Sequence, residues 1–390
     1  MDKWTFKKEN GFFTTIVFLT LIISIYYYIN AFVWGGGAES FKPAIIIYPL
    51  TVLTAAFIFL TKLPKKPLVL QISAFLAVYS FLFTLFQQTS LFSLISSCVY
   101  VVLWFALFIV FFYDSKKYGV SRFFIHSLWI AIPACVISFI FLVNDNQTET
   151  ALKTLNPIFY LLYFIPFICL EKRTSVQMIG AGLVFIAILT SNKRTALLAF
   201  VVCFLYYTIF FIKSSTKNFK KLLNTILAVI IGITVAILLY TQVIKHYANL
   251  DWLDRLLSIW TTGGGGRTER WNQFFIDINN STILEYIFGH GNVSPYYHND
   301  LMQIFYNYGF LGSISYCIMC YLLIFEYFKM KKNKYEYTIA YGTSLIIFFI
   351  TSSFGMVIVV NTWFLQMAMF WGIVLGDFYR FKQKIGVVLK

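Results

Sequence analysis

Residues 263–312 read GGGGRTERWNQFFIDINNSTILEYIFGHGNVSPYYHNDLMQIFYNYGFLG, and they form the only long polar interruption in an otherwise apolar chain. The four glycines at 263–266 lack β-carbons, so their backbone amides are open to a ligand. Apolar residues then recur between 271 and 278 at i, i+3, i+4 and i+7, a spacing that predicts a helix with one apolar face. We expect Thr268 to be the N-cap of this helix.

Two arginines fall at the start of the predicted helix. Arg267 and Arg270 would place positive charge in its first turn, where the helix dipole disfavours a cation unless an anion binds there. Because the glycine run ends at Gly266, directly before these arginines, the segment predicts an anion-binding site.

A second polar cluster, His298-Asn299-Asp300, directly precedes a long apolar segment. We expect that segment to form a long helix on which positions 298, 302, 305, 309, 312 and 316 share one face. Gly309 and Gly312 on this face would let another helix approach closely. We therefore expect His298 to begin on a packed face.

The composition is that of an integral membrane protein. Of 390 residues, 59% are hydrophobic and 12% are charged, and the mean hydropathy is +0.75. The net charge of +15 comes from basic residues between apolar segments, which indicates membrane topology and argues against a nucleic-acid partner. All six cysteines lie in apolar segments, so neither a disulfide framework nor a metal site is predicted.

The hydropathy pattern predicts an all-α polytopic fold with about twelve transmembrane helices in one domain, residues 1–390. The candidate spans are 12–34, 43–61, 68–86, 91–113, 123–143, 156–170, 175–190, 195–212, 222–244, 301–327, 337–358 and 360–378.

Basic residues predict the orientation, because cytoplasmic loops hold the excess of Lys and Arg. With both termini cytoplasmic, only eight of the 31 basic residues fall outside: Lys42, Lys153, Lys193, Arg194, Lys245, Arg255, Arg267 and Arg270. Lys193 and Arg194 occupy a tight connection on the extracytoplasmic side. A basic pair there is contrary to the expected excess of Lys and Arg in cytoplasmic loops. The connection 245–300 is far longer than an ordinary loop, so we expect it to be extracytoplasmic and to carry part of a functional site.

The arginines and the histidine that are predicted on the extracytoplasmic side favour one kind of chemistry. No D-x-D, H-x-x-x-H or G-x-S-x-G pattern is present, so we expect neither a metal nor another cofactor. Guanidinium groups suit phosphate oxygens, and a near-neutral imidazole suits proton removal from a hydroxyl. Structural alternatives stay open: Arg194 as a membrane-border residue, Arg267 and Arg270 as partners of surface carboxylates, and His298 as a hydrogen-bonded residue. For His290 we expect only such a structural role.

These residues resemble the O-antigen polymerase and ligase superfamily of bacterial membrane glycosyltransferases. The matches are Ser191-Asn192-Lys193-Arg194 to its Ser-Arg motif, Gly266-Arg267 with Trp271 to G-R-x-x-x-W, Gly289-His290-Gly291 to G-x-G, and His298-Asn299 with Gly309-x-x-Gly312 to H-N-x9-G-x-x-G. Thr195 departs from the pattern, since the family often has Gly after the Arg. Together the motifs cover about a third of the chain, and the compact loop is more similar to a Wzy-type polymerase than to the lipid A core ligase.

The resemblance implies a GT-C-like enzyme of the bacterial cytoplasmic membrane whose active site faces the extracytoplasmic side. It would polymerise O-antigen or capsule by moving an undecaprenyl-pyrophosphate-linked glycan onto the next lipid-linked unit, with inversion and without a metal. His298 would be the catalytic base. Pyrophosphate contacts would come from Lys193, Arg194, Arg267 and Arg270, and the site would be shaped by Gly266, Trp271, Asn299, Asp300, Gly309 and Gly312.

The resemblance also implies partners, namely a chain-length regulator and a flippase. Two alternatives remain. One is a ligase that transfers finished glycan to lipid A core or another acceptor. The other is a lipid-oligosaccharide flippase or transporter, which the outer-mouth position of the charges disfavours, because transport sites usually lie near mid-bilayer.

Overall fold

The computed structural model describes residues 11–31, 43–63, 66–85, 91–146, 157–191, 193–215, 267–291, 296–355, 357–358 and 361–388. Within these ranges the regular elements are all helices, as the sequence predicted, and no strand occurs. They are α1 (Phe12–Ala31), α2 (Ala44–Phe57), the π-helix η1 (Ile58–Lys62), α3 (Leu68–Leu85), α4 (Leu91–Tyr118), α5 (Arg122–Asn146), α6 (Ile158–Leu162), α7 (Ile165–Ile168), α8 (Thr174–Thr190), α9 (Arg194–Ser215), α13 (Arg267–Asn279), α14 (Ile283–Phe288), α15 (Asp300–Lys332), α16 (Thr338–Phe354) and α17 (Asn361–Val388).

Six of the described helical segments are long and apolar enough to cross a membrane: α1, α2 continued by η1, α3, α4, α5 and α15. Shorter apolar helices are α6 with α7, α8, α9 and α16. These segments support the prediction of a helical membrane protein. The predicted span 222–244 and the loop residues 245–266, Gly266 included, lie outside the described residues.

The predicted span 156–170 is not one continuous helix. It is divided into α6 and α7, and turn residues Tyr163 and Phe164 separate them. Pro166 lies in the first turn of α7, where its missing N–H and its ring prevent the helix from running straight through. The two pieces together are shorter than a bilayer core is thick.

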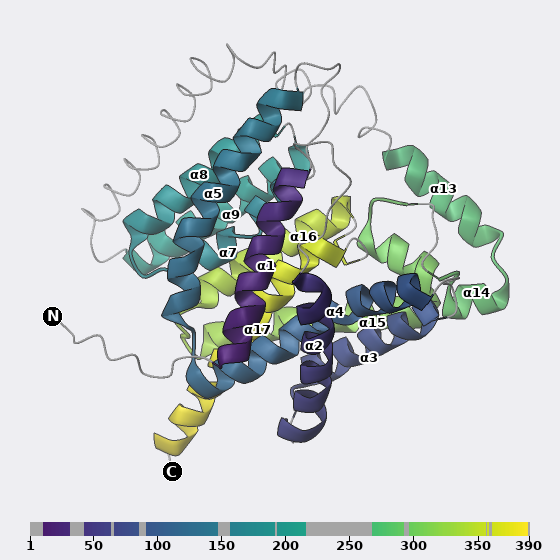
Figure 1. Ribbon diagram of the computed structural model, residues 1–390, viewed down its shortest axis with the longest axis horizontal. Coiled ribbons are helices and arrows are strands. Elements are labelled where there is room, and N and C mark those ends of the chain that lie inside the picture. The colour runs from purple at the N-terminus through teal and green to yellow at the C-terminus, as the bar shows by residue number, and fades with distance from the viewer. Residues whose placement is uncertain are drawn as a thin grey trace.

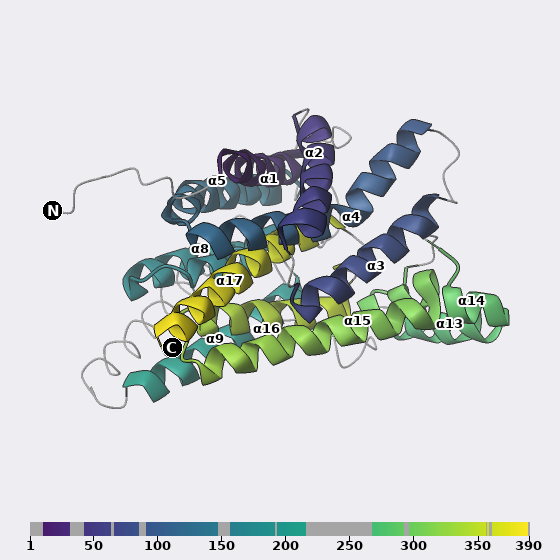
Figure 2. The same ribbon diagram turned by 90° about the horizontal axis from the view of Figure 1, so that it is seen from below.

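Helices α4 and α17 form the packed centre of the molecule, and Figures 1 and 2 show them crossing its middle. Their backbones come close because Gly372 of α17 lies against Phe108 of α4, where a β-carbon would be 2.6 Å from the carbonyl oxygen. Gly376, one turn further, lies in the same way against Phe112. This small-x-x-x-small spacing is the usual means of close helix packing in membranes.

Helix α15 is broken at Gly309, whose φ of 62° and ψ of −163° are not helical. A β-carbon on Gly312 would lie 3.7 Å from Cγ2 of Ile304, although eight residues of straight helix extend about 12 Å. Asp300 is likewise within electrostatic reach of Cys320. The segments 300–308 and 310–332 therefore fold back against each other, with Gly309 at the turn.

The prediction of one continuous apolar helix over 301–327 is thus wrong, and so is the shared face of 298, 302, 305, 309, 312 and 316. The physical reason is that glycine adopts a positive φ at little cost, which lets the chain reverse. Helices α13 and α14 lie beside this turn at one end of the molecule in both views, whereas α17 ends toward the opposite end (Figures 1 and 2).

Candidate functional site

The basic pair predicted at the outer border lies in a tight turn between α8 and α9. The buried hydroxyl of Ser191 donates to the carbonyl of Ile188 at 2.7 Å and accepts the amide of Lys193 at 3.2 Å, which fixes the turn. The Lys193 ammonium lies 5.8 Å from the ring centre of Phe159. Arg194 begins α9, and both cations are partly buried.

Helix α13 brings Arg267 to this turn. Its Nη2 donates to Oγ1 of Thr195 at 3.1 Å, and its guanidinium lies 5.4 Å from the ring centre of Phe354 at the end of α16. Burial and the neighbouring charge of Arg194 lower the pKa of Arg267. Two cations that are far apart in sequence, Arg194 and Arg267, are therefore close in the fold, as a shared anion site requires.

Three contacts attach α13 to the segment before His298. Arg270, which is exposed, donates from Nη1 to the carbonyl of Tyr296 at 3.1 Å. The buried Tyr297 donates its hydroxyl to Oδ2 of Asp277 at 2.7 Å, and its ring packs edge-on against Phe274. These contacts hold the arginine-bearing helix beside the histidine, and the sequence pattern gave no indication of Asp277 or Tyr297.

His298 has a φ of 54°, in the left-handed region that non-glycine residues rarely adopt. Its two following neighbours hold this conformation. Asn299 donates from Nδ2 to the carbonyl of Ser353 at 3.0 Å and caps α15 by accepting the amide of Met302 at 3.1 Å. Asp300, fully buried, accepts the amide of Ile358 at 3.2 Å. Asn299 and Asp300 therefore shape the site by positioning the backbone of His298.

The imidazole of His298 retains an exposed surface instead of lying on a packed face, so that expectation is wrong. Partial burial, followed by the charges of Arg270, Arg267 and Lys193, lowers its pKa from the ordinary value of 6.5. Near neutral pH the ring is therefore mostly uncharged and can accept a proton. The structure brings His298 into the electrostatic range of three of the predicted pyrophosphate-binding residues.

Gly289 of the G-x-G motif and Gly309 of the H-N-x9-G-x-x-G motif are in close backbone contact. A β-carbon on Gly309 would lie 2.6 Å from the amide nitrogen of Gly289, at the end of α14. The amides of His290 and Gly291 donate to the carbonyls of Tyr306 and Asn307, both at 2.8 Å. These glycines therefore join the loop to the turn of α15, and their role is to allow close backbone contact.

His290 has the structural role that the sequence predicted. Its ring stacks on Tyr306 with centroids 4.2 Å apart, and its Nε2 lies 3.2 Å from the hydroxyl of Ser281. Thr268, by contrast, is not the N-cap, because α13 already begins at Arg267. Trp271 is partly buried on α13, and its Nε1 has no hydrogen-bond partner among the described residues.

Charge at the site is predominantly positive. Within the described part of the chain, no salt bridge connects Arg194, Arg267 or Arg270 to a carboxylate. Across the same residues, no group of three or more His, Cys, Asp and Glu side chains is placed to hold a metal ion. The arrangement provides guanidinium donors for an anion and, beside them, a neutral base.

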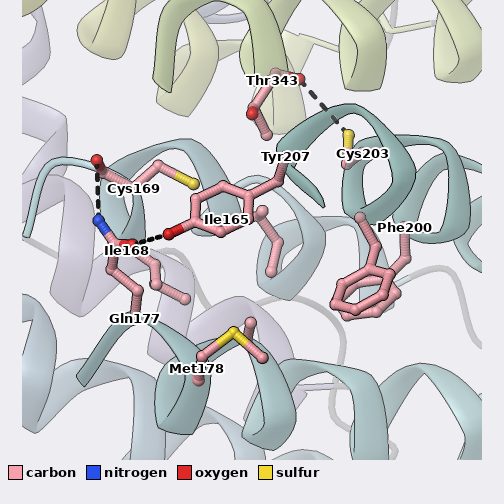
Figure 3. A pocket seen from close by; sticks show the side chains of 11 residues that line it. Ile165, Ile168, Cys169, Gln177, Met178, Phe200, Cys203, Tyr207 and Thr343 are labelled. Carbon is pink, nitrogen blue, oxygen red and sulfur yellow. Dashed lines mark hydrogen bonds between the residues drawn. The ribbon is translucent and has the colours of Figure 1, made fainter. Parts of the chain in front are cut away.

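A cavity of about 40 Å³ lies between α7, α8, α9 and α16, and hydropathy gave no indication of it (Figure 3). Its wall is mostly carbon, from residues such as Ile165, Met178 and Phe200. At one end Tyr207 donates to the side-chain oxygen of Gln177, whose amide nitrogen in turn donates to the carbonyl of Cys169. The cavity contains none of the predicted site residues.

Comparison with known proteins adds no assignment. The chain matches no model of a known protein family. It also matches no curated protein. The functional conclusion therefore depends on the chemistry of the described residues and on the motifs in the sequence.

Proposed function

We propose that this protein is a membrane glycosyltransferase that polymerises surface polysaccharide, O-antigen or capsule, at the extracytoplasmic face of the bacterial cytoplasmic membrane. The donor and the acceptor are glycan units carried on undecaprenyl pyrophosphate. Both chain termini are cytoplasmic, and the segment 245–300 faces outward. The resemblance of the motifs at 191–194, 266–271, 289–291 and 298–312 to O-antigen polymerases supports this assignment.

One observation carries the proposal: Arg267 meets the start of α9, where Arg194 lies, while His298 lies within the field of Arg267, Arg270 and Lys193. Clustered guanidiniums are suited to bind and neutralise a pyrophosphate by paired hydrogen bonds. A base whose pKa is lowered by burial and by the same cations is suited to deprotonate a sugar hydroxyl. The two requirements of glycosyl transfer from a lipid pyrophosphate therefore occur together.

The reaction is a single displacement. The acceptor hydroxyl attacks the anomeric carbon of the donor glycan, its proton passes to the neutral imidazole of His298, and the bond between the anomeric carbon and the pyrophosphate oxygen breaks. The arginines stabilise the charge that develops on the leaving pyrophosphate. Because no covalent enzyme intermediate forms, the anomeric configuration inverts.

The test uses purified protein in nanodiscs with a lipid-linked repeat unit as the sole substrate. A polymerase lengthens the glycan on its lipid and releases undecaprenyl pyrophosphate, whereas a ligase requires added lipid A core or another acceptor. A flippase moves the lipid-linked glycan from one leaflet of the bilayer to the other without changing the length of the glycan. Failure to lengthen the glycan, together with transfer to lipid A core, would assign the ligase reaction instead.

A further inference from the structure

One side of α14 is apolar and exposed, at the end of the molecule where α15 turns. Ile283 is 80% exposed, Leu284 68% and Phe288 43%, and their spacing places them on one side of the helix. Glu285, on a different side, is tied back to Thr282, whose amide donates to its carboxylate at 2.8 Å. We call the surface formed by Ile283, Leu284 and Phe288 the α14 face.

The second segment of α15 indicates the depth of this face in the membrane. From Gly309 to Lys329, at the basic end of α15, a helix rises about 30 Å, which is the thickness of the hydrocarbon core of a bilayer. The turn at Gly309 therefore lies near the border of that core. A β-carbon on Gly289 would be 2.5 Å from the amide nitrogen of Gly309, so the end of α14 lies at the same border.

Tyr79 of α3 connects the α14 face to the surface of a membrane-crossing helix. Its hydroxyl donates to the carbonyl of Phe288 at 3.3 Å, and its ring stacks on that of Phe75 with centroids 5.8 Å apart. Phe75, Val78 and Leu82 are exposed along α3, which is long and apolar enough to cross a membrane. The α14 face is thus continuous with an apolar surface that contacts lipid.

Tyrosines surround this contact. Tyr308 packs against Tyr79 with ring centroids 6.4 Å apart, and Tyr286 packs edge-on against Phe305 at 5.1 Å. Tyrosine is enriched where a membrane meets water, because its ring is apolar and its hydroxyl is polar. Their presence is independent support for placing α14 at this border.

Side chains also satisfy backbone groups at both ends of α14, which a segment in contact with lipid requires. At the start, the hydroxyl of Thr282 accepts the amide of Glu285 at 3.3 Å, and the carboxylate of Glu285 accepts the amide of Thr282. At the end, the amide of Gly289 donates to the carbonyl of Glu285 at 2.7 Å. The carbonyl of Phe288 accepts the hydroxyl of Tyr79.

We propose that α14 inserts its face into the bilayer leaflet at this border, so that its partner is phospholipid. Ile283 and Leu284 gain free energy by leaving water, and they offer a sugar no hydrogen bond. The inference does not depend on the proposed reaction. It bears on the site, however, because residues 280–282 alone join α14 to α13. Insertion of α14 therefore sets the height above the membrane of the helix that carries Arg267.

The experiment places an environment-sensitive fluorophore on Leu284→Cys, in nanodiscs, in a variant without the six native cysteines. The matched control is Asn272→Cys on α13, which is also exposed. Nitroxides on the acyl chains should quench the label at 284, and more strongly near the glycerol than near the methyl end. Aqueous iodide should quench it several-fold less than the label at 272. Adding Ile283→Glu should abolish the lipid quenching at 284.

Equal iodide quenching at the two positions would show that the α14 face lies in water and would overturn the proposal. Protection from both quenchers would overturn it too, because protein, such as a second copy of the chain, would then cover the face. A second measurement needs no substitution. Wild-type protein in nanodiscs that contain a phospholipid with an acyl-chain diazirine should form adducts on Ile283, Leu284 and Phe288. Adducts on Val78 of α3 without any on α14 would reject insertion.

Discussion

Arg267 donates from Nη2 to Oγ1 of Thr195 at 3.1 Å and so joins two positions that are 72 residues apart. Thr195 stands where the family proposed for this chain often has glycine, and its hydroxyl here holds the guanidinium of Arg267 near Arg194. The departure from the motif thus has a structural use. It fixes one cation of the proposed pyrophosphate site by a contact that a glycine could not make.

Replacing Arg267 by Lys should therefore abolish long polymer while the protein still folds. Lys keeps the charge but loses the planar fork of donors and the contact with Thr195. We expect turnover to fall by about 10²–10³-fold, the usual cost of losing one preorganised donor to a leaving oxyanion. Chain-length analysis of the product measures the effect, and Arg173→Lys, on an exposed connection, is the control. Near-normal polymer length in Arg267→Lys would reject the pyrophosphate role.

The pH dependence of turnover should report on His298 and its neighbouring cations. A general base must be neutral, so activity falls as pH decreases through the pKa of His298, which burial and nearby cations hold below 6.5. In Arg270→Gln one of these cations is removed, so the pKa should rise and the acidic limb should move to higher pH. Rates of single turnover between about pH 5 and 8 measure the limb.

The pH profile of single-turnover rates also tests directly whether His298 is the general base. His298→Gln keeps hydrogen-bonding capacity without basicity, so turnover should fall by about 10²–10⁴-fold and the acidic limb should disappear. If this variant works at a near-normal rate, His298 only orients the acceptor. Arg173→Gln removes a distant cation and should leave the wild-type limb in place.

The contact between Gly289 and Gly309 should be intolerant of any side chain. Both residues have positive φ, and a β-carbon on either would collide with the backbone of the other segment. Gly309→Ala should lose about 1–3 kcal/mol from backbone strain alone, with the collision added. Gly182→Ala on α8 is the matched control, since nothing lies within 4 Å of its added carbon. Thermal unfolding in detergent compares them, and equal melting temperatures would contradict the folded-back arrangement of α15.

The orientation in the membrane can be measured with single cysteines in a variant without the six native cysteines, which are free thiols. Glu269→Cys on α13 should react with a membrane-impermeant maleimide added outside intact cells. Lys331→Cys, near the end of α15, should react only after permeabilisation. Both positions are exposed, so access to water depends on the side of the membrane. The reverse labelling pattern would reverse the topology.

The amino-acid sequence alone is enough to establish the helical membrane class and to single out the unusual basic residues and glycines. Apolar segments at spanning length dictate helices, because a bilayer leaves backbone groups no partner outside the segment. Four basic residues oppose the orientation rule, namely Lys193, Arg194, Arg267 and Arg270, and the proposed anion site gives them a reason other than topology.

How these residues meet depends on contacts between segments that are far apart in the sequence. Hydropathy cannot distinguish a straight helix from one that reverses at Gly309, because both segments are apolar and only the backbone angles differ. The attachment of α13 through Asp277 and Tyr297, and the approach of Arg267 to Thr195, join segments that no local pattern relates. The cavity between α7, α8, α9 and α16 is likewise formed by segments that are far apart in the sequence.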